Sequence, residues 1–379
     1  MKKIIAYLVA VFLLVGASEE QSACAAKKKN KGSVKKEAFG KTEDGKKVDA
    51  YILTNKNGLQ AKIITYGAML TEMHVPDKNG KLGDVVFGHD KLEDYLDGHS
   101  YFGVTTGRVA NRIAKGKFML DGSEYTLATN NDPNHLHGGK TGFNKKIWKI
   151  DNIEEIKDST KCVLSYFSPD MEENYPGNLD CKVIYELNND NELSIEFHAT
   201  TDQDTIVNLT NHNYWNFHGH RDHYQNNEDH VVQIYSDAIC ETDQESIPTG
   251  KLLNVSGTKF DLRKSNTVDR ELLNSGGIDH NYALDNQSME VPVAKIYSKK
   301  TKMGVEYFTN QQGIQFYTGN MMLEKYLGKH NKSYGIQYGM CLEPQNYPDA
   351  INQSNFPSPI LRKNKNYLSK IKIKLRNDF

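Results

Sequence analysis

Short stretches in which apolar and polar residues alternate with a period of two run through most of the chain, and they predict β-strands. Residues 50–54 and 59–66 alternate in this way around Asn55-Lys56-Asn57-Gly58, a string of turn-forming residues, so this region predicts a hairpin. Asp121-Gly122 predicts a second hairpin turn within residues 118–127. The alternation recurs farther along the chain, at residues 182–187, 192–197, 231–235, 293–297, 305–309, 314–318 and 370–375.

Helical signals are few. Asp90 and Glu93 have the spacing of a helix start, and Gly98 marks its end, so one short helix is predicted between them. Many short strands joined by turns, with hardly a helix between them, favour antiparallel sheets packed as a large sandwich over βαβ units. The predicted fold class is therefore all-β.

The first 26 residues differ from the remainder and predict a secretion signal. Lys2-Lys3 precedes the apolar residues 4–15, and the small-residue string Ser22-Ala23-Cys24-Ala25-Ala26 follows. The apolar stretch is too short for a comfortable membrane span. We expect export to the periplasm or the extracellular space, with cleavage near the end of the string. Lipid attachment to Cys24 is one alternative, although Gln21 is a poor residue for such a site, and a retained membrane anchor is the other.

Residues 27–37 carry many lysines and predict a solvated basic tether outside the fold. No break in composition divides residues 38–379, which predicts one large domain although the length alone also allows two. The formal net charge of −1 gives no reason to expect a nucleic-acid partner. We expect a monomer with a small-molecule ligand.

Four cysteines follow the signal region, at wide and irregular spacings: Cys162, Cys181, Cys240 and Cys341. No CxxC pair occurs, so neither a zinc site nor a redox site is expected. Export would permit disulfides, and their pairing stays open. Buried free thiols are the favoured interpretation, because unpaired cysteine is among the most buried residue types.

The candidate chemistry lies in four stretches rich in amide, imidazole and acidic side chains, at residues 107–148, 207–217, 277–282 and 341–350. Asn and Arg side chains suit the hydroxyls of a sugar-like ligand, and one carboxylate with one imidazole can act as base and acid. Signatures of a serine nucleophile, a phosphate-binding loop and a dinucleotide fold are missing. These observations predict proton transfer on a neutral polar small molecule.

The motifs in these stretches resemble the aldose 1-epimerase family, also called the galactose mutarotases. In chain order they read GRVANRIAKGKF, LHGGKTGF, NLTNH-x-Y, GIDHNY, GIQFYTGN and CLEPQNYPDA. The resemblance extends from about Ala38 to the C-terminus. It implies a β-sandwich of the galactose mutarotase-like (supersandwich) type. It also implies interconversion of the α and β anomers of free aldohexoses such as galactose and glucose, with no cofactor and no metal.

The resemblance also implies roles for individual residues. Glu343 matches the general base and His212 the general acid. The positions that match sugar-binding residues are Asn111, Arg112, His137, Asp279 and Gln315. Ordinary alternatives stay open for several of them, such as a turn cap for Asp279. Arg108 is expected to be structural, and the aromatic residues Tyr214, Trp215 and Phe316 are expected in the core.

One histidine-rich segment departs from the family pattern. His218-Gly219-His220, Asp222 and His223 have a spacing that suits a metal ion, but a solvated loop is the favoured interpretation. Two other functions remain as alternatives: a non-catalytic sugar-binding protein on the same fold, and a polysaccharide lyase or hydrolase. A hydrolase commonly needs two carboxylates across an extended groove.

Overall fold

The computed structural model describes residues 32–98, 101–219, 226–322 and 327–379. The chain divides into two compact units, and the second, Lys31–Phe379, contains every described residue. The predicted secretion signal and Cys24 therefore lie outside the described residues. No helix within the described ranges is long and apolar enough to span a bilayer.

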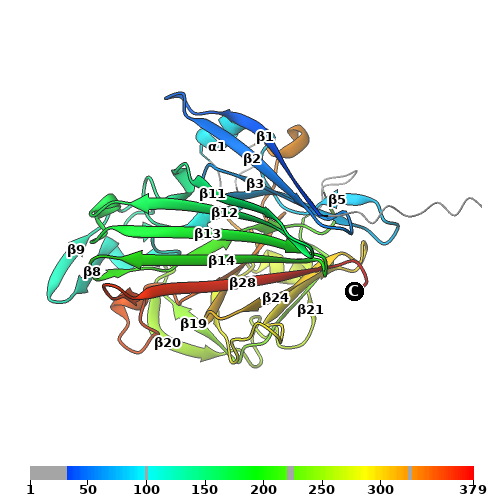
Figure 1. Ribbon diagram of the computed structural model, residues 1–379. Helices are drawn as coiled ribbons and strands as arrows, with labels where there is room; N and C mark the ends of the chain where they lie inside the picture. Colours follow the sequence, from blue (N-terminus) through cyan, green and yellow to red (C-terminus); the bar gives the residue numbers. More distant parts are fainter. Residues whose placement is uncertain (1–31, 99–100, 220–225, 323–326) are drawn as a thin grey trace, which may run out of the picture. The chain divides into compact units, whose positions relative to one another are not determined.

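The largest sheet has nine strands, and its long central members lie side by side in Figure 1. In spatial order the strands are β11 (Lys149–Glu155), β12 (Ser159–Ser168), β13 (Leu179–Asn188), β14 (Glu192–Thr201), β28 (Asn366–Arg376), β24 (Gly304–Thr309), β23 (Ala294–Ser298), β18 (His230–Ile234) and β21 (Asn266–Thr267). Alternate residues of β13, β14 and β28 are fully buried, as the period of two predicts. The strands predicted at residues 182–187 and 192–197 are thereby confirmed, as parts of the antiparallel pair β13 and β14.

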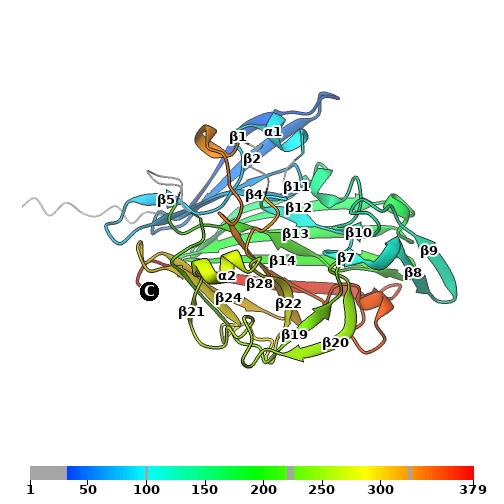
Figure 2. The same cartoon turned by 180° about the vertical axis from the view of Figure 1, so that it is seen from behind.

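A six-stranded sheet supplies the other main face of the core (Figure 2). Its strands, in spatial order, are β17 (Tyr214–Trp215), β26 (Met340–Gln345), β25 (Gly313–Tyr317), β22 (Asp279–Ala283), β19 (Ala238–Thr242) and β20 (Pro248–Asn254). Ile314 and Phe316 of β25 belong to the same apolar cluster as Ile195 and Ile371 of the nine-stranded sheet. Since strand side chains alternate, Gln315 points to the opposite face of the six-stranded sheet.

A third sheet contains the first five strands, in chain order: β1 (Ser33–Lys41), β2 (Lys47–Thr54), β3 (Gln60–Ile64), β4 (Met69–Pro76) and β5 (Leu82–Asp84). The hairpin predicted around residues 55–58 is confirmed as β2–β3. The basic tether was predicted to extend to residue 37, and that limit is wrong, because residues 33–37 pair with β2. Lys35 and Lys36 are exposed while Val34 packs against the core. Lysines are common on such edge strands, so the charge pattern concealed the strand.

The remaining strands form two-stranded ladders: β6 (Val104–Thr106) with β16 (Thr210–His212), β7 (Arg112–Ile113) with β10 (His135–Leu136), β8 (Lys117–Leu120) with β9 (Ser123–Thr126), and β15 (Thr205–Ile206) with β27 (Ile360–Leu361). The ladder β8–β9 confirms the turn predicted at Asp121-Gly122, where both residues have positive φ.

Regular helices within the described ranges are the short α1 (Leu92–Leu96) and α2 (Arg270–Asn274). The same ranges also contain five 3₁₀ turns: η1 (Ala114–Gly116), η2 (Phe143–Lys145), η3 (Glu172–Asn174), η4 (Lys329–Asn331) and η5 (Ala350–Asn352). Helix α1 confirms the predicted helix, but Asp90 does not cap it. The Asp90 carboxylate instead accepts a hydrogen bond from the backbone N–H of His330 at 2.7 Å.

The four cysteines expected as buried free thiols are buried and unpaired, which confirms that prediction. Burial raises the pKa of each thiol, including that of Cys341 to well above its ordinary value. In the metal-free chain such thiols stay protonated near neutral pH.

His230 on β18 is a fully buried, neutral histidine whose two ring nitrogens are both used. Nε2 accepts from the backbone N–H of Phe217 at 3.0 Å, and Nδ1 donates to the carbonyl of Asn227 at 3.1 Å. Burial lowers the pKa of His230 from its ordinary 6.5 to about 3. Because the unfolded chain binds this proton more readily, the associated stability is present above pH 6.5 and is lost as pH falls toward 3.

We therefore expect acidification from about pH 7.5 to about pH 5 to remove roughly 2 kcal/mol of unfolding free energy through His230 alone. His230→Gln, whose amide cannot titrate, should be less stable at pH 7.5 but should lose about 2 kcal/mol less between the two pH values. Urea unfolding of both proteins at both pH values measures this difference. Equal losses in the two proteins would contradict the prediction.

Candidate active site

Three neighbouring strands of the six-stranded sheet place three of the predicted site residues on one face. Gln315 on β25 lies directly opposite Glu343 on β26, and Asp279 on β22 lies opposite Tyr317. The Gln315 side-chain amide donates to Asp279 Oδ1 at 2.6 Å. This register brings the Glu343 carboxylate, the Gln315 amide and the Asp279 carboxylate together although they are far apart in sequence.

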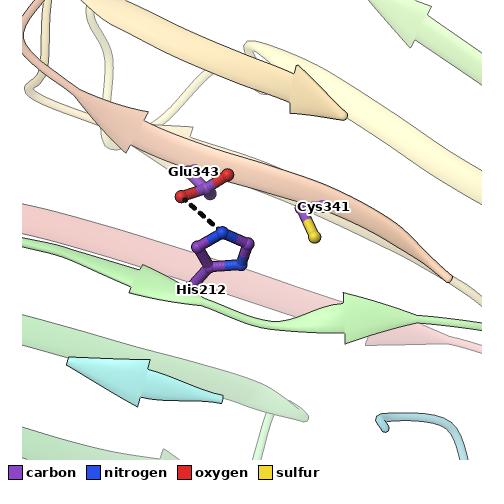
Figure 3. A group of neighbouring side chains, drawn as sticks. All are labelled: His212, Cys341 and Glu343. Carbon is purple, nitrogen blue, oxygen red and sulfur yellow. Dashed lines mark ion pairs between the residues drawn. The ribbon is translucent and has the colours of Figure 1, made fainter. Parts of the chain in front are cut away.

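His212 reaches the same face from β16. The Thr210 hydroxyl donates to the carbonyl of Pro344 at 2.7 Å, which ties β16 to β26 beside the site. His212 Nε2 then lies 3.5 Å from Glu343 Oε2, and the two side chains are 6% and 2% exposed. Figure 3 shows the imidazole and the carboxylate facing each other from the two strands.

Burial acts on the two groups in opposite directions. Burial raises the pKa of Glu343 well above its ordinary value, and the nearby charge of Asp279 raises it further. Burial lowers the pKa of His212 to about 3. An ion pair would shift both groups the other way, but the 3.5 Å separation is too long for a strong hydrogen bond, so the loss of hydration dominates. Glu343 thereby becomes a stronger base and His212 a stronger acid.

A tight loop before β7 positions the next pair of site residues. Asn111 and His137 both have positive φ, and the His137 N–H donates to the carbonyl of Asn111 at 3.0 Å. The Asn111 N–H in turn donates to His137 Nδ1 at 3.1 Å. Because Nδ1 accepts, the proton of the neutral ring lies on Nε2, which is left as a donor. Burial, with the neighbouring His212 and Arg112, lowers the pKa of His137 and keeps the ring neutral.

The two arginines of the GRVANR motif have different surroundings. Arg112 donates from Nε to Asn131 Oδ1 at 3.0 Å, and its side chain lines the site cavity. Arg108 is 2% exposed, and its guanidinium is surrounded by acceptors. These are Ser168 Oγ and the backbone oxygens of Ser168, Pro169, Pro176 and Gly177. Arg108 therefore has the structural role that was expected.

All seven predicted site residues line one cavity of about 190 Å³. That volume corresponds to about six water molecules and is smaller than the roughly 300 Å³ at which drug-sized pockets begin. A single sugar ring suits such a cavity better than a polysaccharide chain does. A larger, shallower hollow of about 800 Å³, bordered by Thr42, Tyr66, Leu96 and Lys146, contains none of the seven residues.

Five further residues line the cavity and were not predicted as site residues: Tyr101, Leu136, Tyr214, Tyr317 and Met321. Tyr214 belongs to a buried apolar cluster, as expected, and its ring also stacks on His212 with centroids 5.0 Å apart. Trp215 and Phe316 do belong to the core, as expected. Tyr317 is two residues after Gln315, so strand alternation would have placed it on the site face.

The histidine-rich segment is described only in part. His218 packs on His230 with ring centroids 4.4 Å apart and does not line the cavity. His220, Asp222 and His223 lie outside the described residues, so both interpretations of that segment remain predictions.

Comparisons with known proteins identify the family and support the fold. The aldose 1-epimerase family model matches residues 49–374. Galactose mutarotase from Bos taurus is 41% identical over 337 residues, covering 88% of this chain and 96% of that protein. Aldose 1-epimerase from Escherichia coli (strain K12) is 32% identical over 335 residues, covering 86% of this chain and 94% of that protein.

Solved structures give the same result for the fold. Galactose 1-epimerase from Lactobacillus acidophilus NCFM superimposes with a TM-score of 0.78 at 25% identity, covering 91% of this chain and 99% of that one. An aldose epimerase homologue from C. elegans superimposes with a TM-score of 0.77 at 29% identity, covering 85% of this chain and 97% of that one. The expected all-β, galactose mutarotase-like sandwich is confirmed. The chain belongs to the aldose 1-epimerase family.

Proposed function

We propose that this chain interconverts the α and β anomers of free aldoses, galactose and glucose among them, with Glu343 as general base and His212 as general acid. The observation that carries the proposal is the 3.5 Å approach of Glu343 Oε2 and His212 Nε2 at a cavity of one-sugar size. The reacting hydroxyl and the ring oxygen of a hemiacetal are bonded to the same carbon, so two groups this close can serve both oxygens. The mutarotase names of the relatives support the same activity.

The reaction balances with one proton in each direction. Glu343 takes the proton of the C1 hydroxyl, the C1 carbonyl forms as the bond to the ring oxygen breaks, and His212 donates its proton to that oxygen. Half a turn about the C1–C2 bond presents the other face of the aldehyde. The ring oxygen then attacks C1 while His212 regains its proton and Glu343 returns one to the new hydroxyl.

The environment favours the step that opens the ring. When the pair begins as carboxylate and imidazolium, both transfers together convert it to two neutral groups. A buried site disfavours charged forms, so the charged pair gains free energy by giving up its charges. The raised pKa of Glu343 and the lowered pKa of His212 therefore favour both proton transfers once the charged pair has formed, and the same shifts make that charged pair the less populated form near neutral pH.

The remaining five predicted residues hold the part of the sugar that does not react. Asp279 and the Gln315 amide form one hydrogen-bonded unit beside Glu343. Arg112, Asn111 and the Nε2–H of His137 line the same cavity and offer further donors. Fixing these hydroxyls leaves rotation about C1–C2 as the free motion, which is the motion the reaction needs.

Removal of either catalytic group tests the assignment. We expect Glu343→Gln and His212→Asn each to slow enzymatic mutarotation by about 10²- to 10⁴-fold, the usual contribution of general acid or base catalysis. Polarimetry of freshly dissolved α-D-galactose and α-D-glucose measures the rate against buffer. Thermal unfolding of each variant serves as the folding control. A folded wild-type protein that binds sugar by calorimetry but does not accelerate mutarotation would instead be a sugar-binding protein.

A matched pair of substitutions distinguishes the sugar-binding role of Arg112 from the structural role of Arg108. Arg112→Lys should raise KM roughly tenfold or more through loss of a charged hydrogen bond, with little change in Tm. Arg108→Lys should cost about 3–5 kcal/mol of stability, because it breaks a buried network around a charge, while KM of the folded enzyme stays near the wild-type value. Steady-state polarimetry and urea unfolding give the two readouts. A raised KM in Arg108→Lys with unchanged stability would contradict the assignment.

We further propose that the chain is exported and acts as a monomer. The basic start, the apolar stretch and the small-residue string of residues 1–26 support export. Intact mass spectrometry of the protein made in a secreting host should give a chain that begins just after Ala25 or Ala26. A mass that includes a lipidated Cys24 would indicate the lipid-anchored form, and an uncleaved chain recovered from the host cytoplasm would contradict export. Light scattering should give the mass of one chain.

A further inference from the structure

A third side chain, unused by the proposed reaction, lies beside the catalytic pair. Cys341 is two residues before Glu343 on β26, so both project from the same face of the strand (Figure 3). One ligand atom each from His212, Cys341 and Glu343 lies within 4.8 Å of the other two, and all three residues are buried. Cys341 does not line the cavity, whereas His212 and Glu343 do.

Two of these three side chains have polar atoms without a partner. His212 Nδ1 and Glu343 Oε2 are buried and make no hydrogen bond within the described part of the chain. Buried polar atoms are usually satisfied, so the unpaired Glu343 Oε2, which lies 3.5 Å from His212 Nε2, invites a cation that both atoms could bind. The two residues are 5% and 2% exposed, which leaves the cavity as their access to solvent.

A second cluster of similar composition already has lysine side chains beside its carboxylates. Glu72, His74 and Asp84 are equally close together, but the Lys329 ammonium contacts Asp84 and the Lys62 ammonium lies 3.0 Å from Glu72. Those lysines already supply the positive charge that a metal would bring. His212, Cys341 and Glu343 have no lysine or arginine ion pair among the described residues.

The three ligand atoms and the distances between them favour one class of metal ion. Nitrogen, thiolate sulfur and carboxylate oxygen are the ligands of zinc, and three protein ligands beside an open position are its usual arrangement in reactive sites. Tetrahedral zinc would hold N and O about 3.3 Å apart and N and S about 3.6 Å apart. The His212–Glu343 distance of 3.5 Å already fits, and the thiol needs at most a shift of about 1 Å from the 4.8 Å limit. A soft sulfur ligand discriminates against Mg²⁺ and Ca²⁺.

We propose that His212, Cys341 and Glu343 bind a thiophilic divalent cation of the Zn²⁺ class, and that the bound ion inhibits the enzyme by occupying its base and its acid. Binding displaces the Cys341 proton to solvent and leaves the metal in the +2 state, so no oxidant is needed. The inhibitory part of this inference rests on the proposed function, whereas the binding part does not.

Metal binding is measured first, without turnover. Co²⁺ added to the full chain should bind at one site and give the near-ultraviolet charge-transfer band of a cobalt thiolate. Cys341→Ser should lose that band, whereas Cys240→Ser, which removes a buried free thiol from β19 of the same sheet, should keep it. Absence of the band in wild type, or its persistence in Cys341→Ser, would overturn the metal site whatever the enzyme's activity.

Inhibition is measured second, by polarimetry, relative to each variant's own metal-free rate. Zn²⁺ should inhibit wild type competitively with sugar and reversibly on adding a chelator, whereas Mg²⁺ at the same concentration should not. The Zn²⁺ concentration for half inhibition should rise at least about tenfold in Cys341→Ser, since loss of even an outer-shell contact costs that much. An unchanged value would overturn the proposal. A wild type that binds Co²⁺ but has no mutarotase activity would overturn the proposed function and leave the metal site standing.

Discussion

The burial of one carboxylate against one imidazole is the constraint on which the site depends. Glu343 and His212 are almost inaccessible to solvent, and neither has an arginine or lysine partner among the described residues. In that environment the pKa of Glu343 rises and the pKa of His212 falls, so each group becomes better at the proton transfer its position allows. The sandwich makes this burial possible, because β25 and β26 have the apolar core on one face and the site on the other.

Asn208 links the segments that must stay aligned for this pair to work. Its side chain accepts from the Asn346 N–H at 2.9 Å and donates back to the Asn346 carbonyl at 3.3 Å. Its backbone N–H donates to the carbonyl of Arg108, and its carbonyl accepts from the N–H of Ala110. Through its side chain and its backbone, Asn208 thus connects the loop before Arg112, the strand leading to His212 and the turn after Glu343. Hydrogen bonds therefore hold motifs far apart in sequence together next to the site residues, which is what catalysis by positioned groups needs.

The all-β class and its hairpins were predictable because alternation with a period of two is a local signal. The seven site residues were predicted from ordered motifs, and the fold does gather them around one cavity. Tyr214 and Tyr317 were missed although each lies two residues after a predicted site residue, where alternation would have indicated them. Tyr101 and Met321 lie outside regular strands, so no local pattern marks them. Asp90 failed as a helix cap because a backbone N–H remote in sequence competes for its carboxylate, which no local pattern can indicate.

The central claim is that Glu343 and His212 act as one unit, in which each group transfers one proton as the ring opens and reverses that transfer as the ring closes. A double-mutant cycle of mutarotation rates with Glu343→Gln, His212→Asn and the combined variant tests it most directly. Two groups that act as a unit predict that the combined variant is about as slow as the slower single variant, roughly 10²- to 10⁴-fold below wild type. Losses that multiply, to about 10⁴- to 10⁸-fold, would mean that the groups act independently and would contradict the claim.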